Sequence, residues 1–238
     1  TAIEAVMSAM SPDFPDRLPA QSGGDLCAVF RYGFDPMTGE MWVEANIEGI
    51  GMGASSFADG ESAMVHILEA CSRNLPVELE EAKDPELIER YELIQDSGGA
   101  GTYRGGLGVR RDYRLLADGR MISVLERCIA PHAGVAGGLP GGRTYGVLDS
   151  SIYGQGFEII KTPDQPIAQG DLLSIRSGGG GGFGSPLERD PERVLEDVLE
   201  ELVSIEAAQE LYGVIFEDEG KVDYESTKRV RAARLSAA

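Results

Sequence analysis

Clustered glycine constrains the fold of this chain more than any other feature of its sequence. Of the 238 residues, 32 are glycine, and most of them fall in five short clusters. Glycine tolerates positive φ and lets backbones approach closely, because it has no Cβ atom. We therefore expect the clusters to let a β-layer and a helix, or two subunits, meet at backbone distance. No fixed period links the clusters, which argues against a repeat array. They lie at 49–53, 97–101, 104–108, 136–142 and 177–184.

The glycine clusters do not match the known phosphate-binding loops. A P-loop needs a lysine and a hydroxyl residue after its glycines, whereas SGGGGGFGS (177–185) contains no lysine. GIGMGA (49–54) matches only the start of a dinucleotide-binding motif, and the acidic Glu48 precedes it. No strand-to-helix unit surrounds it, as that motif requires. The sequence therefore argues against nucleotide binding by this chain alone.

Short segments rich in β-forming residues occupy most of the chain between residues 26 and 177. Leu26–Tyr32 and Glu40–Ile47 flank the turn sequence DPMTG, which predicts a β-hairpin. Short strands at this spacing suggest a β-sandwich or a barrel-like sheet. Further strands are expected in ERYELIQD (89–96), GVRRDYRLL (108–116), RMISVLERC (120–128), RTYGVLD (143–149), GFEIIKT (156–162) and DLLSIRS (171–177).

Helical spacing of apolar residues appears at three places. A first helix is predicted at the N-terminus, where Thr1 and Glu4 fit a capping box. A second is predicted over 59–73 from its apolar intervals. A third, at 190–212, follows an aspartate N-cap and has a proline at its first helical position.

These expectations define an α+β fold. It has a β-rich body of mostly antiparallel strands with glycine-rich loops, one inserted helix and a C-terminal helical arm. We expect the body to span 1–186 and the arm 187–216, with a charged tail at 217–238 that frays. The apolar side of the arm must bury against the β-body or against a part absent from this sequence.

Composition limits the partners and the compartment. Asp and Glu outnumber Lys and Arg by 40 to 21, and the net charge of −19 repels nucleic-acid phosphates. No apolar run reaches the roughly 18–20 residues that cross a bilayer, and residues 1–10 lack the basic start of a signal peptide. The cysteines, Cys27, Cys71 and Cys128, are odd in number and widely spaced. This favours buried thiols in a reducing, cytoplasmic compartment.

Few residues are suited to metal binding or nucleophilic catalysis. The only histidines are His66 and His132, so a three-histidine zinc site is impossible within the chain, and HExxH and paired cysteine ligands are absent. His66 sits among apolar neighbours, which favours a packed structural histidine. His132 lies in a glycine-flanked loop, where functional and structural roles are equally supported. Glu78 and the Glu126–Arg127 pair lie near predicted strand starts, where a charged residue faces either a cleft or solvent.

Three long motifs resemble the hydantoinase B family. They are DSGGAGTYRGGLGVRRDYRLLADG (96–119), SGGGGGFGSPLERDPERVLEDVLEELVSIEAAQELYGVIF (177–216), and the segment 59–91 with Asp59-Gly60, His66, NLPVE (74–78) and ERYEL (89–93). The family includes B components of ATP-dependent hydantoinases, the matching half of 5-oxoprolinase, and subunits of acetone and acetophenone carboxylases. The resemblance runs from Thr1 to about Phe216 and corresponds to the C-terminal half of the family's B components.

The resemblance implies a two-step, ATP-dependent reaction. In such enzymes a partner resembling hydantoinase A, with an actin-like ATPase fold, binds ATP and phosphorylates a carbonyl or enol oxygen. The B component then hosts water attack on the activated amide, or carboxylation of the activated enolate. What remains for the B component is positioning and electrostatic stabilisation.

The chain departs from the family pattern in two respects. The Asp/His metal-ligand segments of the family's N-terminal half are missing here. A companion chain resembling that half, or the rest of a truncated protein, would then carry the divalent metal, which the resemblance suggests is zinc or manganese. At 130–134 the sequence APHAG replaces the proline and aromatic residue frequent in relatives, which leaves the substrate pocket undefined.

We therefore expect a subunit of an ATP-dependent amidohydrolase that opens a hydantoin, oxoproline or similar cyclic amide. It would work in a cytoplasmic hetero-oligomer and be inactive alone, with no cofactor assigned to the chain itself. A component of a bicarbonate-using ketone carboxylase is the enzymatic alternative, and a non-catalytic assembly protein is the other. The resemblance suggests seven residues as polar contacts to substrate or phosphate: Asp59, His66, Asn74, Glu78, Glu126, Arg127 and His132.

Overall fold

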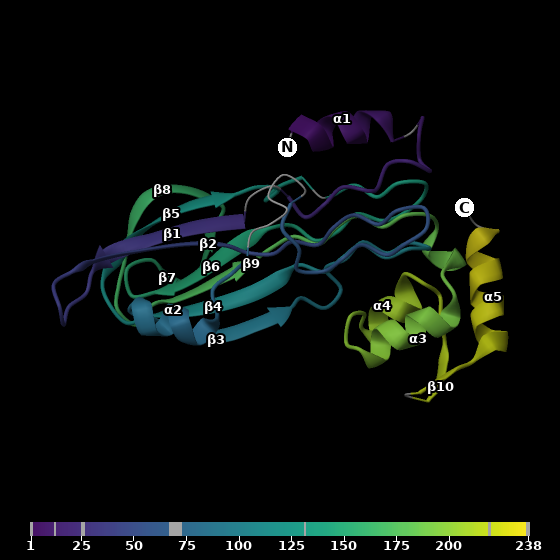
Figure 1. The fold of residues 1–238 in the computed structure, drawn as a ribbon. Helices are drawn as coiled ribbons and strands as arrows, with labels where there is room; N and C mark the ends of the chain where they lie inside the picture. Colours follow the sequence, from purple (N-terminus) through teal and green to yellow (C-terminus); the bar gives the residue numbers. More distant parts are fainter. Residues whose placement is uncertain are drawn as a thin grey trace.

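Two antiparallel β-sheets, stacked face to face, form one end of the molecule in the computed structural model (Figure 1). The structure describes residues 2–11, 13–24, 27–66, 73–130, 132–218 and 220–236. The four-stranded sheet has the order β2-β1-β5-β8 and contains the predicted hairpin. Its strands are β1 (Cys27–Phe34), β2 (Met41–Ile47), β5 (Gly119–Leu125) and β8 (Lys161–Ile167).

The second sheet has five strands in the order β3-β4-β9-β6-β7. The predicted segment GFEIIKT is divided between the sheets, because β7 ends at Ile159 and β8 begins at Lys161. The chain therefore crosses from one sheet to the other at residue 160. The strands of this sheet are β3 (Glu86–Leu93), β4 (Val109–Leu115), β6 (Tyr145–Ser150), β7 (Gly154–Ile159) and β9 (Leu172–Arg176).

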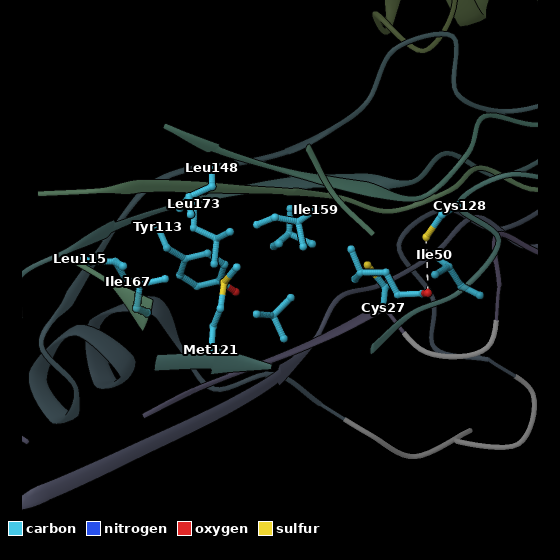
Figure 2. Packing of buried hydrophobic residues seen from close by; sticks show 13 residues of the cluster. Cys27, Ile50, Tyr113, Leu115, Met121, Cys128, Leu148, Ile159, Ile167 and Leu173 are labelled. Carbon is cyan, nitrogen blue, oxygen red and sulfur yellow. Dashed lines mark hydrogen bonds between the residues drawn. The ribbon is translucent and has the colours of Figure 1, made fainter. Parts of the chain in front are cut away.

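The main hydrophobic core lies between the two sheets (Figure 2). Both sheets contribute fully buried side chains, among them Met121 from β5 and Leu148 from β6. Burying such a side chain stabilises the fold by about 1.5–3 kcal/mol. Cys27 and Cys128 are buried free thiols in this core, as expected, and Cys71 lies outside the described residues. The sandwich and the α+β fold class are thus confirmed.

Glycine-rich segments run side by side from the sheets toward the helices and form a bundle held by backbone hydrogen bonds (Figure 1). We call this the glycine bundle; it comprises 20–24, 49–54, 97–108, 133–142 and 177–184. The segment 177–184 is central, because its backbone bonds to each of the other four. The bonds include Gly51 N to Gly178 O (2.9 Å), Gly99 N to Gly180 O (2.8 Å), Gly181 N to Gln21 O (2.8 Å) and Val135 N to Gly182 O (3.0 Å).

The bundle explains the clustering of glycine. A Cβ atom at Gly51 would lie 1.9 Å from the backbone oxygen of Gly106, well inside contact distance. Side chains are therefore excluded where the segments touch. The expected approach at backbone distance is confirmed, but it joins segments of this chain to one another.

The C-terminal arm packs around its own small core. Its helices are α3 (Pro191–Leu199) and α4 (Ile205–Glu210), and the predicted N-cap is confirmed because the Asp190 side chain accepts a hydrogen bond from Glu192 N at 3.0 Å. Val194, Tyr212 and Val214 are fully buried in this second cluster, which also includes Ala100 of the glycine bundle.

The prediction that the chain frays after residue 217 is wrong. Residues 216–222 form a small hairpin of β10 (Phe216–Asp218) and β11 (Lys221–Val222), followed by the helix α5 (Tyr224–Leu235). Thr227 Oγ1 accepts a hydrogen bond from Ile215 N (2.9 Å), and Arg231 Nε donates to Tyr212 O (2.9 Å). Polar side chains thus attach α5 to the arm despite its low apolar content.

The other two helix predictions have different outcomes. The N-terminal helix is confirmed as α1 (Ala2–Met10), although its apolar residues Ile3 and Val6 are 44% and 59% exposed. The helix predicted over 59–73 is not found in 59–66, and 67–72 lie outside the described residues. The backbone N–H of Gly60 instead donates to Arg104 O (2.8 Å), so this segment joins the edge of the glycine bundle. A short helix, α2 (Val77–Lys83), follows Pro76.

Candidate functional site

A cavity of about 480 Å³ opens where the chain leaves β5 and where it crosses between the sheets at residue 160. Two of the predicted site residues, Glu126 and Arg127, contribute to its wall. Lys161 Nζ lies 3.7 Å from Glu126 Oε1, with the lysine 63% and the glutamate 24% exposed. The cavity therefore combines an apolar wall with both signs of charge. Its lining is Leu125, Glu126, Arg127, Cys128, Ile129, Ala130, Ile160 and Lys161.

Arg127 is held in place through both its backbone and its side chain. The backbone has a φ of 57°, a left-handed conformation that residues other than glycine seldom adopt. The guanidinium donates to Gln21 Oε1 (3.0 Å) and to Glu4 Oε2 (3.1 Å). A strained backbone and two side-chain bonds fix a cation at the cavity wall, an arrangement frequent at functional sites.

The Glu4 carboxylate on α1 organises the residues behind this wall. It is 8% exposed and accepts hydrogen bonds from Ser22 N (3.0 Å) and from Arg127. His66, only 1% exposed, places Nε2 3.8 Å from Glu4 Oε1. The predicted capping box involves Thr1, which lies outside the described residues. The described contacts of the Glu4 carboxylate are with the loops beneath α1.

His132 lies within the glycine bundle and is fully buried. Gly141 N donates to its carbonyl oxygen (3.0 Å), and its Nε2 would lie 2.5 Å from a Cβ atom at Gly178. Burial, helped by the positive charge of Arg127 and opposed by the Ser22 backbone, lowers the pKa of His132 to about 4. The imidazole is therefore neutral at pH 7. The structure thus gathers His66, Arg127 and His132 around the loop that carries Gln21 and Ser22.

Acid is expected to destabilise the fold through His132. In the unfolded chain the imidazole titrates near 6.5, but in the folded chain near 4, so the unfolded state binds more protons between these values. Stability is fully present above pH 6.5 and declines as the pH falls toward 4, by about 3 kcal/mol. Urea unfolding of the wild type and of His132→Leu at pH 7 and pH 4 measures this loss, because the variant cannot titrate here. A difference between the two proteins that stays constant with pH would contradict the prediction.

Asp59 belongs to a separate ion cluster that attaches the helical arm to the glycine bundle. Its carboxylate receives two bonds from Arg189 (2.7 and 2.9 Å) and one from Arg193 (3.0 Å). Burial alone would raise the pKa of Asp59, but the bonds and charge of Arg189 lower it below its usual value. Arg189 also donates from Nε to Asp197 on α3 (3.0 Å). These contacts favour a structural role for Asp59.

Asn74 and Glu78 lie at a third place, beside the five-stranded sheet. Asn74 Nδ2 donates to Tyr91 Oη (3.3 Å), and the Tyr91 ring faces the guanidinium of Arg111. Glu78 is exposed on α2, whereas Glu80, two residues later, is fully buried and bonded to Arg111. The buried carboxylate of α2 is therefore not the one that the sequence predicted.

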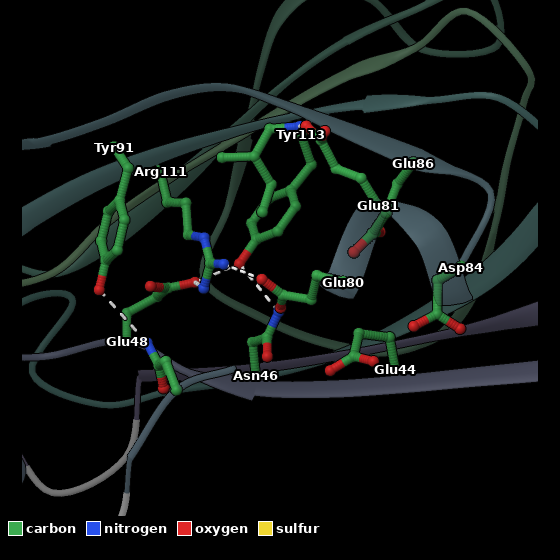
Figure 3. A network of polar contacts seen from close by, with 12 residues as sticks. Glu44, Asn46, Glu48, Glu80, Glu81, Asp84, Glu86, Tyr91, Arg111 and Tyr113 are labelled. Atoms are coloured by element: carbon green, nitrogen blue, oxygen red, sulfur yellow. Dashed lines mark hydrogen bonds and ion pairs between the residues drawn. The ribbon is translucent and has the colours of Figure 1, made fainter. Parts of the chain in front are cut away.

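Glu80 is part of a buried polar network between the sheets (Figure 3). Arg111 Nη1 lies 3.8 Å from Glu48 Oε1, and the Tyr113 hydroxyl donates to Glu48. Burial raises the pKa of Glu48, although the charge of Arg111 opposes the shift. Sequence reasoning missed this network, and it missed Glu4 and Ser22 at the cavity. The polar alternation of Glu44, Asn46 and Glu48 was the available signal, but alternation does not show which face of a strand is buried.

Among the residues that the structure describes, no group of three His, Cys, Asp or Glu side chains is placed to hold a metal ion. No helix in the described part of the chain is long and apolar enough to cross a membrane.

Comparison with known proteins gives one consistent family. The model of the hydantoinase B/oxoprolinase family matches residues 1–186. An uncharacterised protein of Methanocaldococcus jannaschii is 36% identical across 96% of this chain and 40% of its own length. The putative B component of a D-/L-hydantoinase from Pseudomonas sp. strain NS671 is 32% identical across 96% of this chain and 38% of its own length. The crystal structure of the ATP-dependent caprolactamase from Pseudomonas jessenii superposes with a TM-score of 0.80 and 28% identity, covering 94% of this chain and 40% of that one. The chain thus spans about two fifths of the length of these relatives.

Proposed function

Because the chain belongs to the hydantoinase B/oxoprolinase family, we propose that it forms part of the B component of an ATP-dependent amidohydrolase. The substrate class is a cyclic amide, such as a hydantoin, an oxoproline or a lactam. The observation that carries this proposal is the similarity, in both sequence and fold, to a putative hydantoinase component and to an ATP-dependent caprolactamase. The activity belongs to a larger hetero-oligomer, since the chain spans only part of its relatives.

In this proposal a partner resembling hydantoinase A binds ATP and phosphorylates the amide carbonyl oxygen. A companion part, resembling the N-terminal half of the family, completes the B component in the cytoplasm. The described residues offer no three-ligand metal group, so any zinc or manganese ion is assigned to that companion part. No step on this chain is routed through a metal.

The cavity beside β5 is the place we propose for the activated amide. Phosphorylation makes the amide both reactive and anionic, so the B component has to orient it and stabilise negative charge. Arg127, fixed by Glu4 and Gln21, and the exposed Lys161 supply positive charge at the cavity. Glu126 is the lining carboxylate that would accept a proton from the attacking water. His66 and His132 support the wall from behind.

The test is an assay of the complex isolated from its source with its partners attached. We expect ATP hydrolysis that depends on a cyclic amide, releases the ring-opened acid and does not change with added bicarbonate. ATP turnover that requires a ketone and bicarbonate would replace the proposal with the carboxylase alternative. An intact complex whose activity survives loss of the cavity charges would support the assembly role instead.

Arg127→Ala is expected to lower kcat of the assembled complex by about 100-fold, as removal of a fixed electrostatic group commonly does. Arg127→Lys retains the charge but not the two-point attachment, so it is expected to recover part of the loss. Arg114→Ala is the matched control, because that arginine pairs with Glu89 on the surface, away from the cavity lining. Native mass spectrometry checks that all variants assemble. An assembled Arg127→Ala complex with wild-type kcat would contradict the proposed role.

A further inference from the structure

β2 alternates in the opposite sense to a strand on the surface of an isolated domain. Glu44 and Asn46 point inward and are 5% and 6% exposed. Met41 and Val43 point outward and are 64% and 48% exposed. A strand with one solvated face normally directs its apolar residues inward and its polar residues outward.

The neighbouring strand extends this apolar surface. Phe30 and Phe34 of β1 are 39% and 67% exposed. The antiparallel register places Phe34 opposite Met41, and directly opposed side chains on one face of a sheet touch. The result is a continuous patch, here named the outer apolar face: Phe30, Tyr32, Phe34, Met41, Val43, Ala45 and Ile122.

The polar residues on the inner side of β1 and β2 are already satisfied. Glu44 accepts from Lys83 Nζ of α2 (2.8 Å), and Arg31 of β1 is paired with Glu86. The reversed pattern is therefore a stable feature of the folded chain. A strand needs apolar residues on its outer face only if that face is also covered, and contiguous exposed patches mark interaction sites.

The two edges of the sheet differ in the same sense. β8 carries Pro163 and Pro166, which lack backbone donors and discourage pairing with another strand. β2, at the opposite edge, has no proline among its residues. The unprotected edge thus adjoins the outer apolar face, so a partner approaching from the β2 side meets both.

We propose that the outer apolar face is the docking surface for the companion part of the B component. The matched caprolactamase chain is covered only to 40% by this chain, so a family member has three fifths of its length to place around the same fold. That folded remainder has its own apolar surface to bury, and this face is the complement that the chain offers. The inference rests on the proposed family assembly, and it adds the surface through which the assembly forms.

A photo-crosslinking amino acid at Val43, in the complex with its partners, tests this directly. We expect crosslinked peptides from the part of the family sequence that this chain lacks. The matched control is the same probe at Ile152, which is equally exposed at 49% but lies between β6 and β7, and it should give no such product. A crosslink to a second copy of this chain would overturn the proposal, as would no crosslink at Val43 in an intact complex.

Val43→Glu provides a second measurement. The Val43 side chain points to solvent in this structure, so we expect the variant to fold normally, with an unchanged circular dichroism spectrum. Recovery of the companion part during purification should fall at least 10-fold, whereas Ile152→Glu should leave it unchanged. If docking holds but no cyclic amide is opened, the proposed chemistry fails alone. If ring opening is found without a Val43 crosslink, the docking surface fails alone.

Discussion

Gly180→Ala is expected to prevent the chain from folding. The new Cβ atom would lie 2.0 Å from the carbonyl oxygen and 2.3 Å from the carbonyl carbon of Met52, and 2.6 Å from Gly53 N. All three are backbone atoms of a segment that is itself hydrogen-bonded within the bundle, so no side-chain rotation relieves the clash. Ordinary overpacking costs about 1–3 kcal/mol, and separating two bundle segments adds the loss of their hydrogen bonds. A total of about 5 kcal/mol or more is comparable with the whole stability of a typical domain.

Gly142→Ala is the control for this experiment. It lies in the same bundle, but its Cβ atom would meet nothing closer than Ser97 O at 3.4 Å, an ordinary contact. We expect its urea midpoint to shift by no more than about 1 kcal/mol in stability. Circular dichroism and urea unfolding of the two variants give the comparison. Similar midpoints for both variants would mean that the bundle is loosely packed and that its glycines are not required sterically.

Glu86→Gln is expected to destabilise the chain by about 3–5 kcal/mol, because it leaves a buried cation without its counter-charge. Arg31 donates from Nε and Nη2 to the two carboxylate oxygens of Glu86, each at 2.8 Å, and both side chains are fully buried. The guanidinium also stacks on the Tyr113 ring at 3.9 Å. A glutamine has the same shape but carries one donor where two acceptors are needed. Chemical unfolding measures the change.

An exposed pair and a double variant complete this test. Glu158→Gln breaks the Arg143–Glu158 pair, whose side chains are 44% and 48% exposed, and should cost at most about 1 kcal/mol. Replacing both buried partners, as Arg31→Met with Glu86→Leu, should restore much of the stability lost in Glu86→Gln. If Glu86→Gln and Glu158→Gln cost the same, burial does not determine the strength of the pair.

The β-strands were predictable because local signals specify them. Turn residues such as DPMTG and ADGR separate segments of β-forming residues, and every strand from β1 to β9 falls within or beside a predicted segment. The helix at 59–73 was mispredicted because helical spacing of apolar residues does not reveal where backbone N–H groups bond. Gly60 and Ala63 donate to residues 104 and 107, far along the chain, and this overrides the local pattern.

The candidate site was predictable in its residue types but not in its arrangement. The resemblance selected Glu126, Arg127 and His132, which do lie in or behind one cavity wall. It also selected Asp59, whose carboxylate is occupied by arginines from the helical arm. Nothing in the sequence connects Glu4 with Arg127, because their contact depends on how α1 rests on the loops beneath it.

The central position of 177–184 in the bundle has a consequence for synthesis on the ribosome. Gln21 and Gly181 share a hydrogen bond, so one of the first segments to emerge waits for one of the last. Until then, four glycine-rich segments lack the partner that holds them together, and such non-local pairing makes folding slow and exposes the nascent chain to aggregation. A product that terminates just before residue 177 would contain most of the β-strands yet have nothing around which to assemble its loops. Premature termination there is therefore expected to be as damaging as loss of a whole sheet.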